Sequence, residues 1–177
     1  ASKGRAFILS TSIKSMNEIT VLLKDKFEQN NISYPIFTQG TGSKTKLLER
    51  FKSHGNAVLI GSLSFWEGVD VRGSHLSLVI IDKLPFQSPG DPIFESKINM
   101  LTAKGINAFM SFQLPKAVIS LKQGAGRLIR DEMDKGVLMI CDQRIVTKPY
   151  GKKFWRSLPE FKRTREQDDV IEFLKHL

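Results

Sequence analysis

The stretch QGAGRLIR, residues 123–130, places Gln123, Arg127 and Arg130 within one short segment. A guanidinium group is planar and permanently charged, and it can bind phosphate oxygens through two parallel hydrogen bonds. Two such groups three residues apart share one face when the segment is helical. The glycines in the same segment each cost a helix about 1 kcal/mol relative to alanine. The stretch therefore indicates either a phosphate-binding site or a solvated helix end with incidental charges.

A second polar stretch, GSLSFWEGVDVRG at residues 61–73, follows a short apolar run. Its two acids, glycines, serines and adjacent aromatic residues exceed what a simple connection needs. Glu67 and Asp70 could accept hydrogen bonds from a ribose or hold a facing arginine, although either acid alone reads as a solvated side chain. For Phe65 and Trp66, local packing is favoured over base stacking.

A third group of polar residues follows the first apolar run of the chain. Thr11, Ser12 and Lys14 come directly after the run RAFILS. Small hydroxyl groups and backbone N–H groups at the start of a helix suit a phosphate. An ordinary helix N-cap explains the same residues equally well.

The elements that must position these groups alternate along the chain. Apolar runs predict strands at 5–11, 34–37, 57–60, 76–81 and 136–140. Apolar residues at helical spacing predict helices at 16–29, 44–52, 92–101, 115–130 and 168–177, with another near 106–112. This alternation predicts a doubly wound α/β fold, with a parallel sheet between helices and ligands at the carboxyl ends of the strands. We expect one domain over residues 1–177, with a helical insert at about 85–130.

The composition is that of a basic folded protein. Lys and Arg outnumber Asp and Glu by 27 to 18 in 177 residues, and the net charge of +9 suggests a polyanionic partner. No apolar run approaches the roughly 20 residues that span a bilayer, so no membrane association is expected. The single cysteine, Cys141, excludes an internal disulfide, and the three histidines lack metal-ligand spacing. We expect a reducing cytoplasmic location and, since the chain begins at Ala1, a piece of a longer protein.

Together the three groups resemble the second RecA-like domain of a superfamily 2 helicase. Their sequences are similar to the motifs of the iron–sulfur DNA helicases related to XPD, in particular the bacterial DinG and YoaA type. SFWEGVDVRG resembles motif V of that family, QGAGRLIR resembles motif VI and FILSTSIKSM resembles motif IV. The segments DKLPF…PGDPIF and GVLMICDQRIVTKPYGKKFWRSLP also resemble the bacterial members, so the resemblance covers nearly the whole chain.

The resemblance implies an ATP-dependent DNA helicase of 5′→3′ polarity that acts in bacterial DNA repair or replication. ATP and Mg²⁺ would lie between this domain and an N-terminal helicase half, which would also hold the 4Fe–4S cluster. Arg130 would be the arginine finger, Arg127 its companion at the phosphate and Gln123 a nucleotide sensor. Further residues on the nucleotide side would be Glu67, Gly68 and Asp70. This chain alone would lack ATPase activity and would hold no metal.

The resemblance also implies a single-stranded DNA track over this domain. The predicted DNA contacts are Thr11, Ser12, Lys14, Ser62 and Ser64. The N-terminal half of the same helicase would be a second partner of the domain.

An alternative function is that of a non-catalytic module that docks a replication or repair partner. Val170, Phe173, Leu174 and Leu177 form an apolar stripe at helical spacing. The stripe either packs on its own domain or docks another protein. The YoaA resemblance makes the χ subunit of the DNA polymerase III clamp loader the candidate partner.

Overall fold

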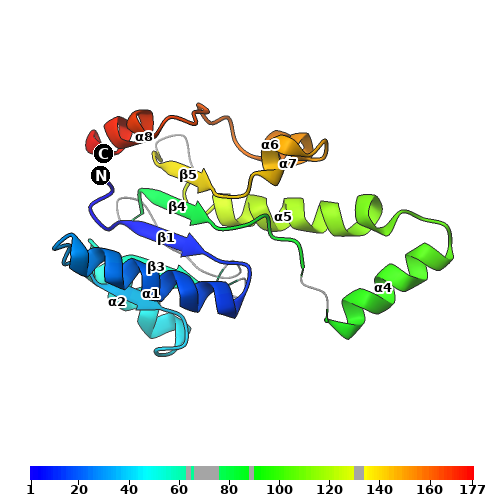
Figure 1. Cartoon of the computed structure of the whole chain (residues 1–177), viewed down its shortest axis with the longest axis horizontal. Coiled ribbons are helices and arrows are strands. Elements are labelled where there is room, and N and C mark those ends of the chain that lie inside the picture. The colour runs from blue at the N-terminus through cyan, green and yellow to red at the C-terminus, as the bar shows by residue number, and fades with distance from the viewer. Residues whose placement is uncertain (63–64, 66–75, 88–89, 130–133) are drawn as a thin grey trace.

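The computed structural model describes residues 1–62, 65, 76–87, 90–129 and 134–177. Within these residues the centre of the fold is a parallel sheet with the strand order β2-β3-β1-β4-β5 (Figure 1). The strands are β1 (Ala6–Leu9), β2 (Ile36–Thr38), β3 (Val58–Gly61), β4 (Leu78–Ile81) and β5 (Val137–Ile140). The predicted parallel sheet is confirmed, and every strand lies where an apolar run predicted one.

Helices connect and flank the strands. They are α1 (Ile13–Gln29), α2 (Lys44–His54), α4 (Pro92–Ala103), α5 (Leu114–Ala125), α6 (Arg144–Thr147), α7 (Gly151–Ser157) and α8 (Gln167–Lys175). A π-helical turn, η2 (Phe109–Gln113), runs directly into α5, and α4 projects away from the sheet (Figure 1). None of the helices in the described part of the chain has the length and apolar character needed to span a membrane.

Side-chain caps explain where α1 and α4 begin. The Ser12 hydroxyl accepts a hydrogen bond from the Ser15 N–H at 3.0 Å and so caps α1. Asp91 caps α4 by accepting from two backbone N–H groups, and Pro92 takes the first helical position, where no N–H is needed. The N-cap interpretation of Ser12 is therefore confirmed.

Helices lie on both faces of the sheet because the connections run in two directions. The connection from β1 to β2 runs toward one edge, whereas those from β2 to β3 and from β4 to β5 run toward the other. Right-handed crossovers of opposite direction place their helices on opposite faces. On the α1 face, Met16 packs against Ile8 and Ile60, whereas Phe51 of α2 and Leu121 of α5 belong to the core cluster on the opposite face.

The helix α5 ends earlier than the predicted helix at 115–130. Ala125 is its last residue and Gly126 is its C-cap, whose N–H donates to the Lys122 carbonyl at 2.9 Å. Gly124 and Gly126 both lower helix propensity at this point, which explains the early end. Arg127 therefore lies in the turn after the helix, so the prediction that its helix continues to residue 130 is wrong beyond Ala125.

A cluster of aromatic rings fixes α7 against α5 and the segment after β4. The Phe86 ring stacks on Phe109 at 5.6 Å between ring centroids, and Tyr150 and Phe154 meet Phe86 edge-on at 5.8 Å and 5.9 Å. Phe154 is fully buried. Gly151, the first residue of α7, is buried where a Cβ would overlap the Ile145 carbonyl. Only glycine allows α6 and α7 to approach this closely.

We predict that Gly151→Ala lowers the free energy of unfolding by about 1–3 kcal/mol, because the added methyl group forces α6 and α7 apart. Denaturant unfolding followed by circular dichroism measures this change. Gly42→Ala is the matched control, since no atom lies within 4 Å of a Cβ there. Equal stabilities of the two variants would contradict the close-packing interpretation.

Candidate functional site

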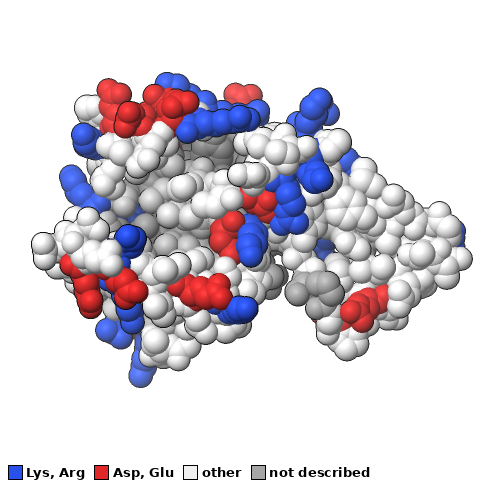
Figure 2. Space-filling view, in the orientation of Figure 1, with Lys and Arg blue, Asp and Glu red and all other residues white. Residues whose placement is uncertain are grey.

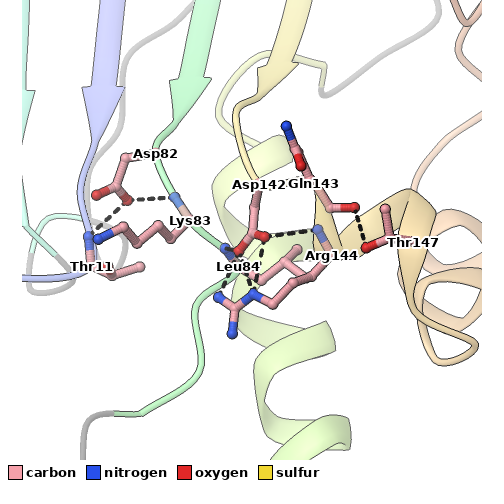
Figure 3. A network of polar contacts seen from close by, with 8 residues as sticks. All are labelled: Thr11, Asp82, Lys83, Leu84, Asp142, Gln143, Arg144 and Thr147. Carbon is pink, nitrogen blue, oxygen red and sulfur yellow. Dashed lines mark hydrogen bonds and ion pairs between the residues drawn. The ribbon is translucent and has the colours of Figure 1, made fainter.

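Asp82, the first residue after β4, ties that strand to the segment that starts α1. Its carboxylate accepts a hydrogen bond from the Thr11 N–H at 3.0 Å (Figure 3). It also accepts one from the Ser15 hydroxyl at 2.7 Å. The same carboxylate also accepts from the Lys83 N–H at 2.6 Å. The loop after β1 is therefore held in place by the neighbouring strand.

The third group of predicted site residues lies on this loop. Thr11 is half-buried, and its N–H is engaged by Asp82. Ser12 is exposed, and the Lys14 side chain is 87% exposed, with its ammonium 4.0 Å from Glu18. All three residues lie at the carboxyl end of β1, as predicted. Their contact with a phosphate stays a prediction.

Ser62, at the carboxyl end of β3, is turned toward the protein. The residue is buried, and both its N–H and its hydroxyl donate to the Gln39 side-chain oxygen, at 2.7 Å and 2.8 Å. This contact joins the ends of β2 and β3. Ser64, the other predicted contact in this stretch, lies outside the described residues.

A second buried carboxylate, Asp142, follows β5. It accepts from the Leu84 N–H at 2.8 Å and from the backbone N–H of Arg144 at 2.9 Å. The Arg144 guanidinium binds it as well, with 2.6 Å between Nη2 and Oδ2 (Figure 3). Burial alone would raise the pKa of Asp142, but the hydrogen bonds from Arg144 and Leu84 outweigh it and hold that pKa below its usual value.

A shallow pocket of about 380 Å³ lies between the ends of β4 and β5. Its lining comprises Asp82, Lys83, Cys141, Asp142, Gln143 and Arg144. Burial, and after it the negative charge of Asp82, raise the pKa of the Cys141 thiol. A protonated thiol is a poor nucleophile, so the pocket offers polar binding groups rather than a reactive cysteine.

The described part of the motif VI stretch ends near the amino ends of the strands, whereas Lys14 lies at their carboxyl ends. The helix α5 runs back from the carboxyl ends of the strands toward their amino ends (Figure 1). Leu128, just past the helix, packs so close to Gly136 that a Cβ at this glycine would overlap the Leu128 side chain and approach the Ser77 carbonyl. Gly136 and Ser77 directly precede β5 and β4. Gln123 is exposed on the last turn of α5 and Arg127 is half-buried. Leu128 and Lys14 therefore lie at opposite ends of the strands.

Several predicted residues of motifs V and VI lie outside the described residues: Glu67, Gly68, Asp70 and Arg130, together with Trp66. Phe65 is described and is 3% exposed, with its ring edge-on to Phe7 at 6.4 Å between centroids. The prediction that Phe65 serves local packing is therefore confirmed.

The predicted apolar stripe of the C-terminal helix divides between core and surface. Leu174 is 3% exposed, whereas Phe173 beside it is 42% exposed. Val170 and Leu177 are half-buried. Leu174 therefore anchors α8 on its own domain, and Phe173 faces solvent.

Asp82, Asp142 and Arg144 were missed by the sequence analysis. Each acid follows an apolar strand within two residues, as in LVIID and VLMICD. An acid at that position is a signal, because the carboxyl ends of parallel strands meet at one edge of the sheet.

The chain is similar to a helicase family model and to named helicases. Residues 1–161 match the family model of the helicase C-terminal domain. The chain is 48% identical over 176 residues to the ATP-dependent DNA helicase YoaA of Haemophilus influenzae, covering 99% of the chain and 27% of that protein. It is 50% identical over 174 residues to YoaA of Escherichia coli, covering 98% of the chain and again 27% of the relative. The chain thus spans about a quarter of the length of these curated relatives.

Solved structures support the same fold. An apo XPD structure matches with a TM-score of 0.64 and 26% identity, covering 91% of this chain and 32% of that one. The second domain of the DEAD-box helicase Mss116p, bound to an RNA duplex, matches with a TM-score of 0.52 and 15% identity, covering 98% of this chain and 58% of that one. The latter likeness concerns the fold alone.

We predict that Asp142→Asn lowers the free energy of unfolding by about 1–3 kcal/mol at neutral pH, because the Arg144 guanidinium and the Leu84 N–H lose a charged acceptor. The folded-state pKa of Asp142 lies below its unfolded value, so its contribution is present above about pH 4 and is lost as the pH falls through the folded pKa. The stability difference from the parent protein should therefore narrow in acid. Denaturant unfolding at several pH values measures it, with exposed Asp25→Asn as control. A gap that does not change with pH would contradict the assignment.

Proposed function

The chain belongs to the helicase C-terminal domain family, and on that premise we propose that it is the second motor domain of an ATP-dependent DNA helicase. The names of the YoaA relatives and the XPD-like fold support this proposal. The proposed polarity is 5′→3′, with a role in bacterial DNA repair or replication. Because the chain spans about a quarter of its relatives, the motor requires an N-terminal half.

ATP and Mg²⁺ bind, in this proposal, between the domain and that N-terminal half. The 4Fe–4S cluster of the family belongs to the other half as well. The residues described here do not fit a cluster, since no group of three His, Cys, Asp or Glu side chains among them could hold a metal and Cys141 is the single cysteine of the chain.

The nucleotide side of the domain is its motif VI stretch. Arg130 is the proposed arginine finger, Arg127 its companion and Gln123 the nucleotide sensor. As the terminal phosphoryl group leaves, negative charge grows on its oxygens, and a positioned guanidinium stabilises that charge by a factor of about 10³–10⁵ in rate. Glu67, Gly68 and Asp70 of motif V are the proposed link between nucleotide state and DNA grip.

The DNA side of the domain lies at the carboxyl ends of the strands. Thr11, Ser12 and Lys14 contact the single strand, with Ser64 as a further proposed member of the track, while Ser62, which is buried and donates to Gln39, holds the end of β3 in place. Asp82 keeps the first three in place through its hydrogen bonds to Thr11 and Ser15. The observation that carries the proposal is that Leu128, within motif VI, and the Lys14 loop lie at opposite ends of four-residue strands, which are about 13 Å long.

A second candidate function is docking of a partner protein through α8. The supporting observation is the 42% exposure of Phe173 beside the buried anchor Leu174. An exposed aromatic side chain on a fixed helix can fill a pocket of another protein. The candidate partner is the χ subunit of the DNA polymerase III clamp loader.

We predict that Arg130→Ala in the full-length protein lowers ATP turnover by about 10³-fold or more while ATP binding changes little, because the contact forms in the transition state. Steady-state ATPase assays and equilibrium nucleotide binding measure the two effects. Arg130→Lys should not rescue turnover, because an ammonium group lacks the planar fork of guanidinium. Turnover close to that of the parent protein would refute the finger assignment.

We predict that Phe173→Ala abolishes binding to the purified χ subunit and leaves the melting temperature unchanged, since the side chain faces solvent. Leu174→Ala is the comparison and should lower the melting temperature by removing the buried anchor. Calorimetric titration and thermal unfolding are the measurements. Unchanged χ binding in the Phe173 variant would exclude this docking surface.

A further inference from the structure

Basic residues are concentrated on the short helices α6 and α7. Residues 143–159 contain Arg144, Lys148, Lys152, Lys153 and Arg156 and no Asp or Glu. These five positive charges compare with a net charge of +9 for the whole chain. In Figure 2, blue side chains gather at the upper right, over α6 and α7. About a tenth of the chain therefore supplies more than half of its net charge.

Four of these charges are available to a ligand. Arg144 is not among them, because its guanidinium is bound to Asp142 and lies over the Phe86 ring at 5.3 Å. The other four side chains are exposed, and none forms an ion pair with the part of the chain that the structure describes. We call Lys148, Lys152, Lys153 and Arg156 the basic patch.

The basic patch sits on a rigid support. Phe154, which lies between Lys153 and Arg156 in sequence, is fully buried in the aromatic cluster. Gly151 lets α7 pack directly against the Ile145 carbonyl. Side chains on a fixed helix lose less freedom when they bind than side chains on a loose tail. Lys152 and Lys153 lie four and three residues before Arg156 on α7, so they are neighbours of Arg156 on the helix surface.

The aromatic side chains of this region are not free to stack on bases. Tyr150 and Phe154 pack within the aromatic cluster, and Arg163 covers the Trp155 ring at 4.8 Å from its centroid. Proteins that hold single strands combine positive charge with aromatic platforms for successive bases. A surface with charge and no platform suits a phosphate backbone whose bases are already paired.

The position of the basic patch fits the same conclusion. α6 and α7 follow β5 at its carboxyl end, beyond the last strand in the order of the sheet (Figure 1). The proposed single-stranded track lies at the same edge, over β1 and β3, and the pocket lined by Lys83 and Arg144 lies between the two. A duplex beside the track is where paired strands would meet the motor.

We propose that the basic patch binds the phosphate backbone of duplex DNA next to the single-stranded track. This inference rests on the proposed function, since it takes DNA as the substrate. It adds a second DNA-binding surface, formed by residues outside motifs IV, V and VI.

The test compares two DNA probes in the full-length protein. One is a blunt duplex about two helical turns long, and the other is an oligothymidylate of the same length. Alanine replaces all four residues of the basic patch, and fluorescence anisotropy measures affinity over a range of salt concentrations. We expect duplex affinity to fall at least about tenfold and the salt slope to decrease by about 3–4, because about four phosphate contacts are lost. Oligothymidylate affinity should change less than about twofold, since the patch lacks the stacking platform of single-strand sites.

Two further variants sharpen the test. Lys14→Ala should show the reverse pattern, with weaker oligothymidylate binding and unchanged duplex binding. A charge-matched control replaces Lys24, Lys26, Lys97 and Lys104, which are exposed on α1, on α4 and just after it, and it should retain duplex binding.

Three outcomes would overturn the proposal. Equal loss on both probes in the basic-patch variant would make the patch part of the single-stranded track. Unchanged duplex binding would exclude it as a DNA surface, and equal loss in the charge-matched control would reduce its effect to net charge. Equilibrium binding needs no ATP turnover, so a failure of the motor assignment in the Arg130 assay stays distinguishable from each of these results.

Discussion

The segments at the carboxyl ends of the strands are held in place by two aspartates, each of which accepts a hydrogen bond from a backbone N–H group distant in sequence. Asp82 binds the Thr11 N–H, 71 residues away, and Asp142 binds the Leu84 N–H, 58 residues away. A buried or half-buried carboxylate is costly without hydrogen-bond donors, so each one specifies the position of the backbone that satisfies it. The start of α1, the segment after β4 and the helices after β5 are positioned in this way. The loop with Lys14 and the helices α6 and α7, both proposed to contact DNA, are built on those segments.

The proposed function assigns nucleotide and DNA to opposite ends of the strands. Motif VI lies where α5 returns to the amino ends of β4 and β5, while the loop with Lys14 lies at the carboxyl ends. The central strands β1 and β3 are buried along their whole length, and such packed elements move as units. In the proposed function, a change in nucleotide contact at one end of the strands would shift the proposed DNA track at the other end by moving the whole domain.

The sequence predicted the elements that depend on local signals. Apolar runs located the strands, and Asp91 with Pro92 located the start of α4, because both signals lie within the element that they define. The end of α5 was misjudged because the helical spacing of apolar residues was given more weight than the two glycines at its end. Asp82 and Asp142 were missed because their partners are distant in sequence, and only the topology of the sheet brings them together. The motif residues were identified by resemblance, and only the course of α5 shows that Leu128, within motif VI, lies away from the Lys14 loop.

Gly151 also has a consequence for how the domain can vary among relatives. The absence of a side chain lets α7 rest on α6, so the scaffold depends on one position that tolerates no substitution without repacking. The neighbouring lysines are exposed to solvent. Charge on this surface can consequently be raised or lowered over evolution, or by an engineer, with little effect on folding. In the proposed function, the salt dependence of duplex binding can therefore change independently of the fold.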